Sequence, residues 1–211
     1  MPQLKRGVLI SIEGIDGSGK STLAKNLSNL LQNKQYKVLL TREPGGTPFG
    51  MHVRELIIQR DILHCSKAQY LLFAADRAQH FEEVVIPALQ SNTIVISDRL
   101  SDSSLAYQCY GNGLSIDMVT MINQWTMNSI KPDVTIYVRV PLDVALERVA
   151  QRNNGITSFE KKEFLEKVLD GFEALYKKRT DVVQIDGTQS SEMVTQQTYT
   201  AIETWLQDKI F

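Results

Sequence analysis

Gly14-Ile15-Asp16-Gly17-Ser18-Gly19-Lys20-Ser21 fits the phosphate-binding pattern G-x-x-x-x-G-K-[ST] without a mismatch. An apolar run at residues 8–12 before it predicts a buried strand, and leucines at positions 23, 27, 30 and 31 recur at helical spacing after it. The motif therefore lies at a turn from a strand into a helix, which is the setting that a Walker A loop requires. A glycine turn that matches by coincidence is the alternative, and the flanking strand and helix argue against it.

The composition of this loop explains how it would bind a nucleotide. Its glycines let successive backbone N–H groups point at phosphate oxygens, and the helix that begins near Lys20 adds the positive end of its dipole. The Lys20 ammonium would reach the outer phosphates, and the Ser21 hydroxyl would bind a magnesium ion. The loop by itself therefore predicts a kinase or a nucleotide phosphatase.

The composition also limits the classes of protein to which the chain can belong. From its 211 residues we expect one domain, residues 1–211, with room for a sizeable core. The formal net charge is -1, from 23 basic and 24 acidic residues, so no basic field attracts nucleic acid or an anionic membrane. Cys65 and Cys109 are too few for a disulfide framework or a zinc cage. No apolar run approaches the ~18 residues of a membrane span, and the first residues lack a signal peptide's apolar core. We therefore expect a soluble, cytoplasmic protein.

Apolar runs alternate with helical patterns along the whole chain. This alternation predicts an α/β fold, a three-layer sandwich in which a five-stranded parallel sheet is covered by helices on both faces. The predicted strands run from Val8 to Ile12, Tyr36 to Leu40, Thr93 to Ile96, Val134 to Val140 and Val182 to Ile185. No internal repeat and no linker composition marks a domain boundary.

Polar residues follow two of these strands, at the sheet edge where open α/β sheets place their ligands. The second strand leads into the turn-rich segment Thr41-Arg42-Glu43-Pro44-Gly45-Gly46-Thr47, and the third strand ends just before Asp98-Arg99. An isolated Asp-Arg pair is usually a surface ion pair, but a position at a strand's carboxyl end favours a function.

An aromatic ring and a guanidinium share one face of the helix predicted around residues 71–77. Phe73 and Arg77 are four residues apart, so together they could hold a flat, polar ring, although Phe73 alone would more often be a core aromatic. Ser104, Tyr107 and Gln108 follow the third strand in a hydroxyl-rich helix start, for which ordinary N-capping is the alternative.

Together these motifs resemble the bacterial thymidylate kinases, which are P-loop nucleoside monophosphate kinases. The matching motifs occur in the family's order and cover most of the chain: the phosphate loop, residues 41–47, Leu72-Phe73-Ala74-Ala75-Asp76-Arg77, Asp98-Arg99 with Ala106-Tyr107-Gln108, and Lys131-Pro132-Asp133. The resemblance implies that the chain phosphorylates dTMP to dTDP with ATP and Mg²⁺, in dTTP synthesis. It also implies a homodimer, with no nucleic acid and no membrane as partner.

The resemblance implies a role for each matched residue at the acceptor nucleotide. Phe73 would stack on the thymine, and Arg77 would hydrogen-bond its carbonyl edge. Ser104 and Gln108 would approach the polar edge of the base from the other side. Tyr107 would pack beneath the deoxyribose and leave no room for a 2′-hydroxyl.

The resemblance further implies how the phosphates are held. Arg99 would bind the acceptor's 5′-phosphate, and Asp16 would lie near the sugar 3′-hydroxyl. Asp98 and Glu43 would order the magnesium shell, and Arg54 is a weaker candidate for the acceptor phosphate.

The predicted catalytic residues are Lys20, Asp16, Arg99, Asp98 and Arg152. The predicted ATP-binding residues are Gly14, Ile15, Asp16, Gly17, Ser18, Gly19, Lys20, Ser21, Thr22, Arg148 and Arg152. The predicted acceptor-binding residues are Glu43, Pro44, Arg54, Phe73, Arg77, Arg99, Ser104, Tyr107 and Gln108. The predicted metal ligands are Ser21, Asp98 and Glu43.

A short mobile lid is expected at about residues 148–162. Arg148 and Arg152 lie four residues apart on one helix face, and Asn153-Asn154-Gly155 breaks the helix after them. A solvated helix end whose arginines complement the dipole is the alternative. The family commonly has Asp-Arg before an apolar residue and Glu, where this chain has Thr157-Ser158-Phe159-Glu160. Ser158 thus stands where a lid arginine is expected, so one lid arginine is missing. We therefore expect Arg152 to carry more of the catalytic charge than is usual.

Other departures from the family leave the assigned chemistry intact. They are Leu100, Cys109, Asn112 and Arg139. A further set of apolar residues falls roughly at helical spacing and predicts core or subunit contacts: Met118, Val119, Ile122, Trp125 and Ile130. The histidines show no ligand spacing, so we expect no metal site besides the magnesium of the nucleotide; they are His52, His64 and His80.

Two alternative functions stay open. Another kinase of the same fold could act on a different nucleotide or on a nucleoside, and a panel of acceptors would decide between them. A GTP-dependent switch would be a protein of a different class. Such switches generally read guanine with Asn-Lys-x-Asp, and the nearest match here, Asn33-Lys34-Gln35-Tyr36, lacks the aspartate.

Overall fold

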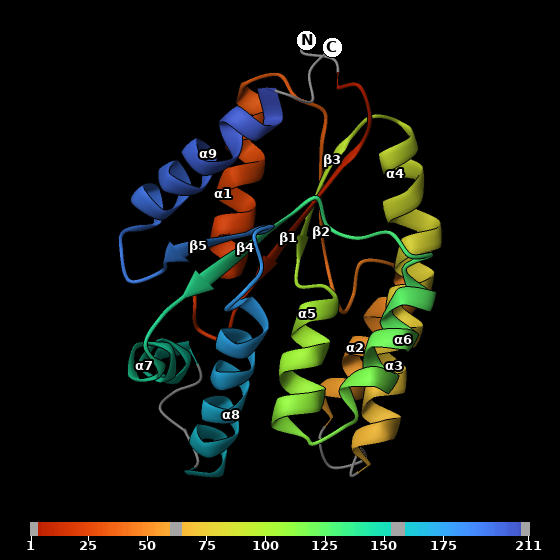
Figure 1. Cartoon of the computed structure of the whole chain (residues 1–211), viewed down its shortest axis with the longest axis vertical. Helices are drawn as coiled ribbons and strands as arrows, with labels where there is room; N and C mark the ends of the chain where they lie inside the picture. Colours follow the sequence, from red (N-terminus) through yellow and green to blue (C-terminus); the bar gives the residue numbers. More distant parts are fainter. Residues whose placement is uncertain (1–3, 60–64, 153–158, 208–211) are drawn as a thin grey trace.

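Five parallel strands form the sheet of the protein, in the order β2-β3-β1-β4-β5 (Figure 1). The computed structural model describes residues 4–59, 65–152 and 159–207. The strands are β1 (Val8–Glu13), β2 (Val38–Arg42), β3 (Ile94–Asp98), β4 (Val134–Arg139) and β5 (Val182–Asp186). The predicted parallel sheet of five strands is confirmed.

Most strands end later than the apolar pattern predicts. The hydrogen-bonded ladder continues through polar residues, because Asp98 pairs with Ile12 of β1 on one side and with Arg42 of β2 on the other. A pattern based on hydrophobicity ends a strand at its last apolar residue and therefore stops too early. The consequence is functional, since Arg42 and Asp98 are held by the sheet itself and not by a loop.

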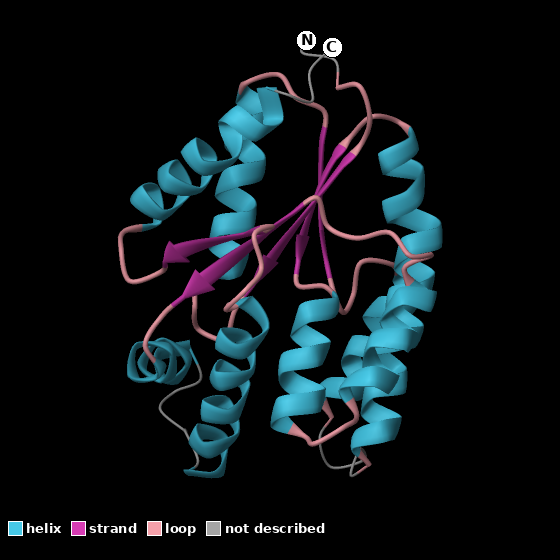
Figure 2. Ribbon diagram, in the orientation of Figure 1, coloured by secondary structure: helices cyan, strands magenta, loops and turns pink. Residues whose placement is uncertain are grey.

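Helices cover both faces of the sheet, as predicted (Figure 2). On one face lie α1 (Lys20–Asn33) and α9 (Ser191–Gln207), against a core cluster that includes Ile10 of β1. The neighbouring residue Leu9 points to the opposite face, as strand geometry requires. There it packs with Phe81 and Val85 of η2 (Phe81–Val85), a π-helical segment that continues into α4 (Ile86–Gln90).

The same second face is covered beside β4 by the π-helical η3 (Leu105–Gly111), which continues from α5 (Ser101–Ser104), and by α8 (Phe159–Tyr176). Helix α8 and η3 pack closely because each presents a glycine to an aromatic ring of the other. A Cβ at Gly111 would lie 2.6 Å from the ring of Phe164, and a Cβ at Gly171 would lie 2.7 Å from the ring of Tyr110. Larger residues would push the two segments apart.

The remaining helices lie beyond or beside the carboxyl ends of the strands. They are α2 (Pro48–Ile58), α3 (Ser66–His80), α6 (Ile116–Thr126) and α7 (Leu142–Arg152). Helices α2, α3 and α6 gather together at the lower right of Figure 1, and α7 lies at the lower left. No helix in residues 4–59, 65–152 and 159–207 is long and apolar enough to cross a membrane.

Candidate active site

The turn from β1 into α1 has the shape that phosphate binding requires. Gly14, Gly17 and Gly19 have φ angles of 144°, 87° and 99°. Glycine is needed at position 17 because a Cβ there would lie 2.3 Å from the carbonyl oxygen of Ala145 on α7. Helix α1 begins at Lys20, directly after the turn, so its N-terminal N–H groups open toward the space above the loop.

Lys20 is buried in the floor of this loop. Its Nζ donates a hydrogen bond to the carbonyl oxygen of Ile15, at 2.7 Å. Burial, and next the positive charge of Arg99, lower the pKa of Lys20 to about 8. A bound phosphate would supply the negative charge that this ammonium needs.

A cavity of about 240 Å³, here called the donor cavity, opens over the loop. It is lined by Asp16, Gly17, Gly19, Lys20, Ser21, Arg42, Glu43, Arg54, Asp98 and Arg99. The hydroxyl of Ser21 donates to the carboxylate of Asp98, so two of the predicted magnesium ligands lie together and offer the oxygen atoms that Mg²⁺ prefers. Among the described residues, no three His, Cys, Asp or Glu side chains form a metal site by themselves. Phosphate oxygens and water molecules would complete the coordination of a magnesium ion here.

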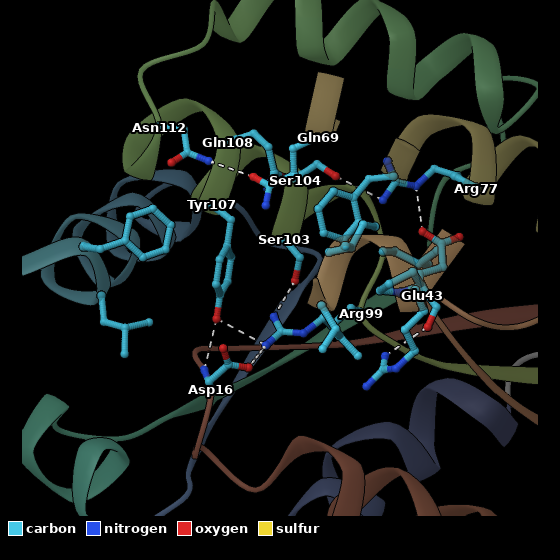
Figure 3. Close-up of a pocket in the computed structure, with 18 residues that line it drawn as sticks. Asp16, Glu43, Gln69, Arg77, Arg99, Ser103, Ser104, Tyr107, Gln108 and Asn112 are labelled. Carbon is cyan, nitrogen blue, oxygen red and sulfur yellow. Dashed lines mark hydrogen bonds and ion pairs between the residues drawn. The ribbon is translucent and has the colours of Figure 1, made fainter. Parts of the chain in front are cut away.

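A second cavity of about 610 Å³, here called the acceptor cavity, adjoins the first (Figure 3). Its volume is in the range of small-molecule sites. All the residues predicted to bind the acceptor line it: Glu43, Pro44, Arg54, Phe73, Arg77, Arg99, Ser104, Tyr107 and Gln108. These residues come from α2, α3, α5, η3 and the ends of β2 and β3, and the fold brings them to one place.

Arg77 is fixed in one orientation at the wall of the acceptor cavity. Its Nε donates to Glu43 Oε2 at 2.8 Å, Nη1 donates to Asn123 Oδ1 at 2.6 Å, and Nη2 donates to Ser104 Oγ at 3.1 Å. The side chain is almost fully buried. Glu43 uses its other oxygen to bind His80, at 2.9 Å. The prediction that Glu43 orders the magnesium shell stays a prediction, because both of its oxygens bind protein groups here.

Arg99 joins the two cavities. Its backbone has a φ angle of +75°, which is uncommon outside glycine and marks a conformation held by the surroundings. Its guanidinium donates to the carbonyl oxygen of Gly14 at 3.1 Å, to Ser103 Oγ at 2.9 Å and to Asp16 Oδ1 at 2.6 Å. The side chain is thereby aimed at the boundary between the donor and acceptor cavities.

Tyr107 supports this junction from η3. Its hydroxyl accepts hydrogen bonds from the Asp16 backbone N–H, at 3.0 Å, and from Arg99 Nη2, at 3.2 Å. The Arg99 guanidinium also lies 4.9 Å from the centre of the Tyr107 ring. Burial raises the pKa of the Tyr107 hydroxyl, so the group stays neutral. Figure 3 shows Tyr107, Asp16 and Arg99 converging at one corner of the acceptor cavity.

Glu13 is a buried carboxylate beneath Arg99 that sequence reasoning missed. Its oxygens accept hydrogen bonds from the hydroxyls of Ser11 and Ser103 and from the backbone N–H of Leu100. Burial, and next the charge of Asp102, raise the pKa of Glu13 to about 7. A carboxylate directly after the apolar run of β1 was the available signal for this residue.

Further lining residues were also missed, among them Gln69, Asn112 and Phe164. Gln69 could have been found, because it lies four residues before Phe73 on α3 and so shares its helix face. Asn112 was noted only as a departure from the family, and its amide donates to Gln69 Oε1 at 3.4 Å. Phe164 lies on α8, beyond the expected lid, where no motif marks it.

The lid prediction is only partly within the described residues. Arg148 lies on α7, as predicted, and its Nη1 donates to the carbonyl oxygen of Gly187 at 2.9 Å and to that of Gly17 at 3.5 Å. It therefore touches the phosphate loop directly. Arg152 is the last residue of α7, but its side chain is outside the described part of the chain. Residues 153–158, with Ser158, are also outside it, and the lid stays a prediction.

The departures from the family fall away from the two cavities or fit into their walls. Arg139 pairs with Glu173 on α8, at 2.7 Å, and Leu100 is buried in the wall of the acceptor cavity.

Of the apolar set around α6, Val119 is buried, whereas the Trp125 side chain is 78% exposed. The core alternative for Trp125 is therefore wrong, and the subunit-contact alternative stays a prediction.

Several known proteins are similar to this chain. The family model described as Thymidylate kinase matches residues 12–198. The thymidylate kinase of Kosmotoga olearia is 39% identical over 192 residues, which are 90% of this chain and 92% of the relative. That of Thermosipho africanus is 39% identical over 200 residues, 95% of this chain and 100% of the relative. The crystal structure of thymidylate kinase from Ehrlichia chaffeensis has a TM-score of 0.78 at 30% identity, and the match covers 93% of this chain and 98% of that chain.

Proposed function

This chain belongs to the thymidylate kinase family, and from this premise we propose how its residues carry out the reaction. It phosphorylates dTMP to dTDP with ATP as the phosphate donor. One observation supports the roles proposed below. The donor and acceptor cavities share a wall, which consists of Asp16, Glu43, Arg54 and Arg99. A phosphate in one cavity would therefore lie next to a phosphate in the other.

In the acceptor cavity the thymine would lie between Phe73 and the polar groups of Arg77, Ser104 and Gln108. Arg77 and Ser104 already hydrogen-bond each other, so their positions are set before the base arrives. Tyr107 would pack under the deoxyribose. Its hydroxyl is held by Asp16 and Arg99, and this fixed position would exclude a 2′-hydroxyl.

Phosphoryl transfer needs alignment and positive charge more than covalent help, because the transition state is loose and its charge spreads over peripheral oxygens. Arg99 would hold the acceptor phosphate in line with the γ-phosphorus, with Arg54 as a second cation that lines both cavities. Lys20 would neutralise charge on the transferred group, and Arg148 and Arg152 would add charge from the side of α7. No general base is needed, because the acceptor phosphate is already an anion near neutral pH.

Magnesium is part of this proposal, with Ser21 and Asp98 as the residues that would hold it. When bound, it would neutralise charge on the phosphate oxygens. Asp98 is fixed for this task by its place in the ladder between β1 and β2.

The assembly of the protein is proposed on an exposed apolar surface. Met118, Met121 and Trp125 lie on one face of α6, with side chains that are more than half exposed, and Leu71 on the adjacent α3 is exposed as well. We propose that a second copy of the chain covers this surface in a homodimer.

We also propose that residues 1–211 form a single domain and that the protein is cytoplasmic. The cytoplasmic location is supported by two free cysteines.

A panel of acceptors tests the proposed function. ADP release would be measured with ATP, magnesium and each of dTMP, dUMP, dCMP, AMP, GMP, UMP and thymidine. We expect dTMP to be the best acceptor and dUMP to be weaker by ~1 to 3 kcal/mol, because it lacks the methyl contact. A purine monophosphate that is phosphorylated faster than dTMP would contradict the proposal.

A further inference from the structure

The buried side chain of His80 has no part in the reaction described above. It lies on α3, three residues after Arg77, and is 0% exposed. Its Nδ1 lies 2.9 Å from Glu43 Oε1, and its Nε2 lies 2.7 Å from Thr41 Oγ1. The ring therefore has a polar partner on each nitrogen.

The partners decide which nitrogen carries a proton. An ionised carboxylate only accepts hydrogen bonds, so Nδ1 of His80 must donate to Glu43. Glu43 in turn accepts from Arg77 Nε with its other oxygen, at 2.8 Å. A continuous chain of hydrogen bonds thus runs from Thr41 on β2, through His80 and Glu43, to Arg77.

This chain of hydrogen bonds helps to set the plane of the Arg77 guanidinium. A guanidinium has five N–H donors in a fixed planar fork. Three of them are used by Glu43, Asn123 and Ser104, which leaves one N–H on each terminal nitrogen for a ligand in the acceptor cavity. Rotation of Glu43 would remove the partner of Nε and leave the fork held only through its two terminal nitrogens.

His80 is itself held in one place. A Cβ at Gly46 would lie 2.5 Å from His80 Cδ2, so the backbone of the 41–47 segment rests directly on the ring. The edge-on contact between the rings of His80 and Phe81, with centroids 6.2 Å apart, supports it from the next residue of the chain. The ring therefore has no room to release Glu43.

We propose that His80 is a positioning residue for recognition of the acceptor base, acting through Glu43 on Arg77. The inference rests on the proposed role of Arg77 in binding that base. His80 touches neither substrate, and its effect is to keep the Arg77 fork aligned before dTMP enters.

Two substitutions at position 80 separate positioning from simple packing. The amide nitrogen of Asn can take the place of Nδ1, so His80→Asn can still donate to Glu43. The longer side chain of His80→Gln places its amide near Nε2 instead and loses that donor. For binding measured by calorimetry, we expect His80→Gln to weaken dTMP at least fivefold, with ATP affinity within twofold of the parent. His80→Asn should recover most of the loss. The control is His52→Gln, the same exchange at an exposed histidine, which should bind both nucleotides like the parent.

A double-mutant cycle identifies the route of the effect. If His80 acts through Arg77, His80→Gln should weaken dTMP binding by less than twofold in the Arg77→Ala background. A full fivefold loss in that background, or equal losses in the Asn and Gln variants, would overturn the proposal. If Arg77→Ala itself binds dTMP like the parent, the role of Arg77 is wrong, and this outcome is separate from the result at position 80.

Thr41→Val provides a test that does not depend on the folding of the His80 variants. It removes only the hydroxyl that binds His80 Nε2 and keeps the shape of the side chain. We expect a two- to fivefold loss of dTMP affinity with ATP binding unchanged. Unchanged dTMP binding would contradict the chain of hydrogen bonds proposed here.

Discussion

Lys20 is expected to make ATP binding depend on pH in a range where the phosphates of ATP do not titrate. In the phosphate loop its pKa is lowered from 10.5 to about 8, first by burial and then by Arg99. A bound triphosphate would favour the charged ammonium and raise this pKa again. The fall in pKa from 10.5 to about 8 corresponds to ~3 kcal/mol of cost for the charged form in this buried position.

The size of the effect follows from the fraction of Lys20 that is protonated. If only the ammonium form binds phosphate well, the apparent dissociation constant rises as 1 + 10^(pH − 8), which is ~1.1 at pH 7 and ~11 at pH 9. ATP should therefore bind about tenfold more weakly at pH 9 than at pH 7. About half a proton should be taken up per ATP bound at pH 8. The second ionisation of a phosphate monoester has a pKa near 6, below this range, so the nucleotide contributes little to this slope.

Calorimetric titration with ATP and magnesium, without dTMP, measures both quantities. Proton uptake is obtained from the difference in heat between two buffers of different ionisation enthalpy. The control is Lys20→Met, which should bind more weakly and show no slope between pH 7 and pH 9. Equal affinities of the parent at pH 7 and pH 9, with no proton uptake, would refute the reasoning. The same slope in Lys20→Met would assign the titration to another group.

Three further predictions concern the lid, the subunit contact and stability. Arg152→Ala should lose at least ~10²-fold in turnover with little change in dTMP affinity, and turnover within threefold of the parent would contradict this prediction. Arg148→Ala should lose less turnover and should raise the KM for ATP, because Arg148 touches the phosphate loop. Trp125→Glu should convert a dimer into a monomer in sedimentation experiments, and a parent that is already monomeric would show that the proposed contact is wrong. Burial raises the pKa of Glu13 from 4.5 to about 7, so its contribution to the free energy of unfolding should be lost as the pH rises from 4.5 to 7, by ~3 kcal/mol. Burial also raises the pKa of Asp76 to about 6, which lowers the free energy of unfolding in the same direction. Urea denaturation at pH 5 and pH 7.5 measures this pH dependence, most of which should be missing in Glu13→Gln. An unchanged pH dependence of the free energy of unfolding in that variant would contradict the assignment.

The fold and much of the acceptor cavity could be predicted because their signals are local. The phosphate loop, the alternation of apolar runs and the spacing of Phe73 and Arg77 are each visible within a few residues of sequence. A parallel sheet then brings the carboxyl ends of its strands to one edge, so motifs after different strands meet without any knowledge of their contacts.

The supporting hydrogen bonds could not be predicted because their partners are distant in sequence. Glu43 is 34 residues from Arg77, and Glu13 is 90 residues from Ser103. The position of Glu13 directly after an apolar run suggests burial, but the sequence near either glutamate does not show which donors from other segments a buried carboxylate finds. His80 was excluded as a metal ligand by its spacing from the other histidines. That spacing contains no information about the hydrogen bonds of His80 to Thr41 and Glu43.

The wall shared by the donor and acceptor cavities has a consequence for the design of inhibitors. Because both cavities border Asp16 and Arg99, a compound that joins a nucleotide-like group in each needs only a short linker. Once the first group is seated, the second binds as if at high local concentration, so the joined compound gains affinity without any new contact. The gain is largest for a linker that is anionic, since it would replace the phosphates between Arg99 and Lys20. A compound confined to the acceptor cavity could still reach Arg99 but not Lys20, which lines only the donor cavity, and would lose this advantage.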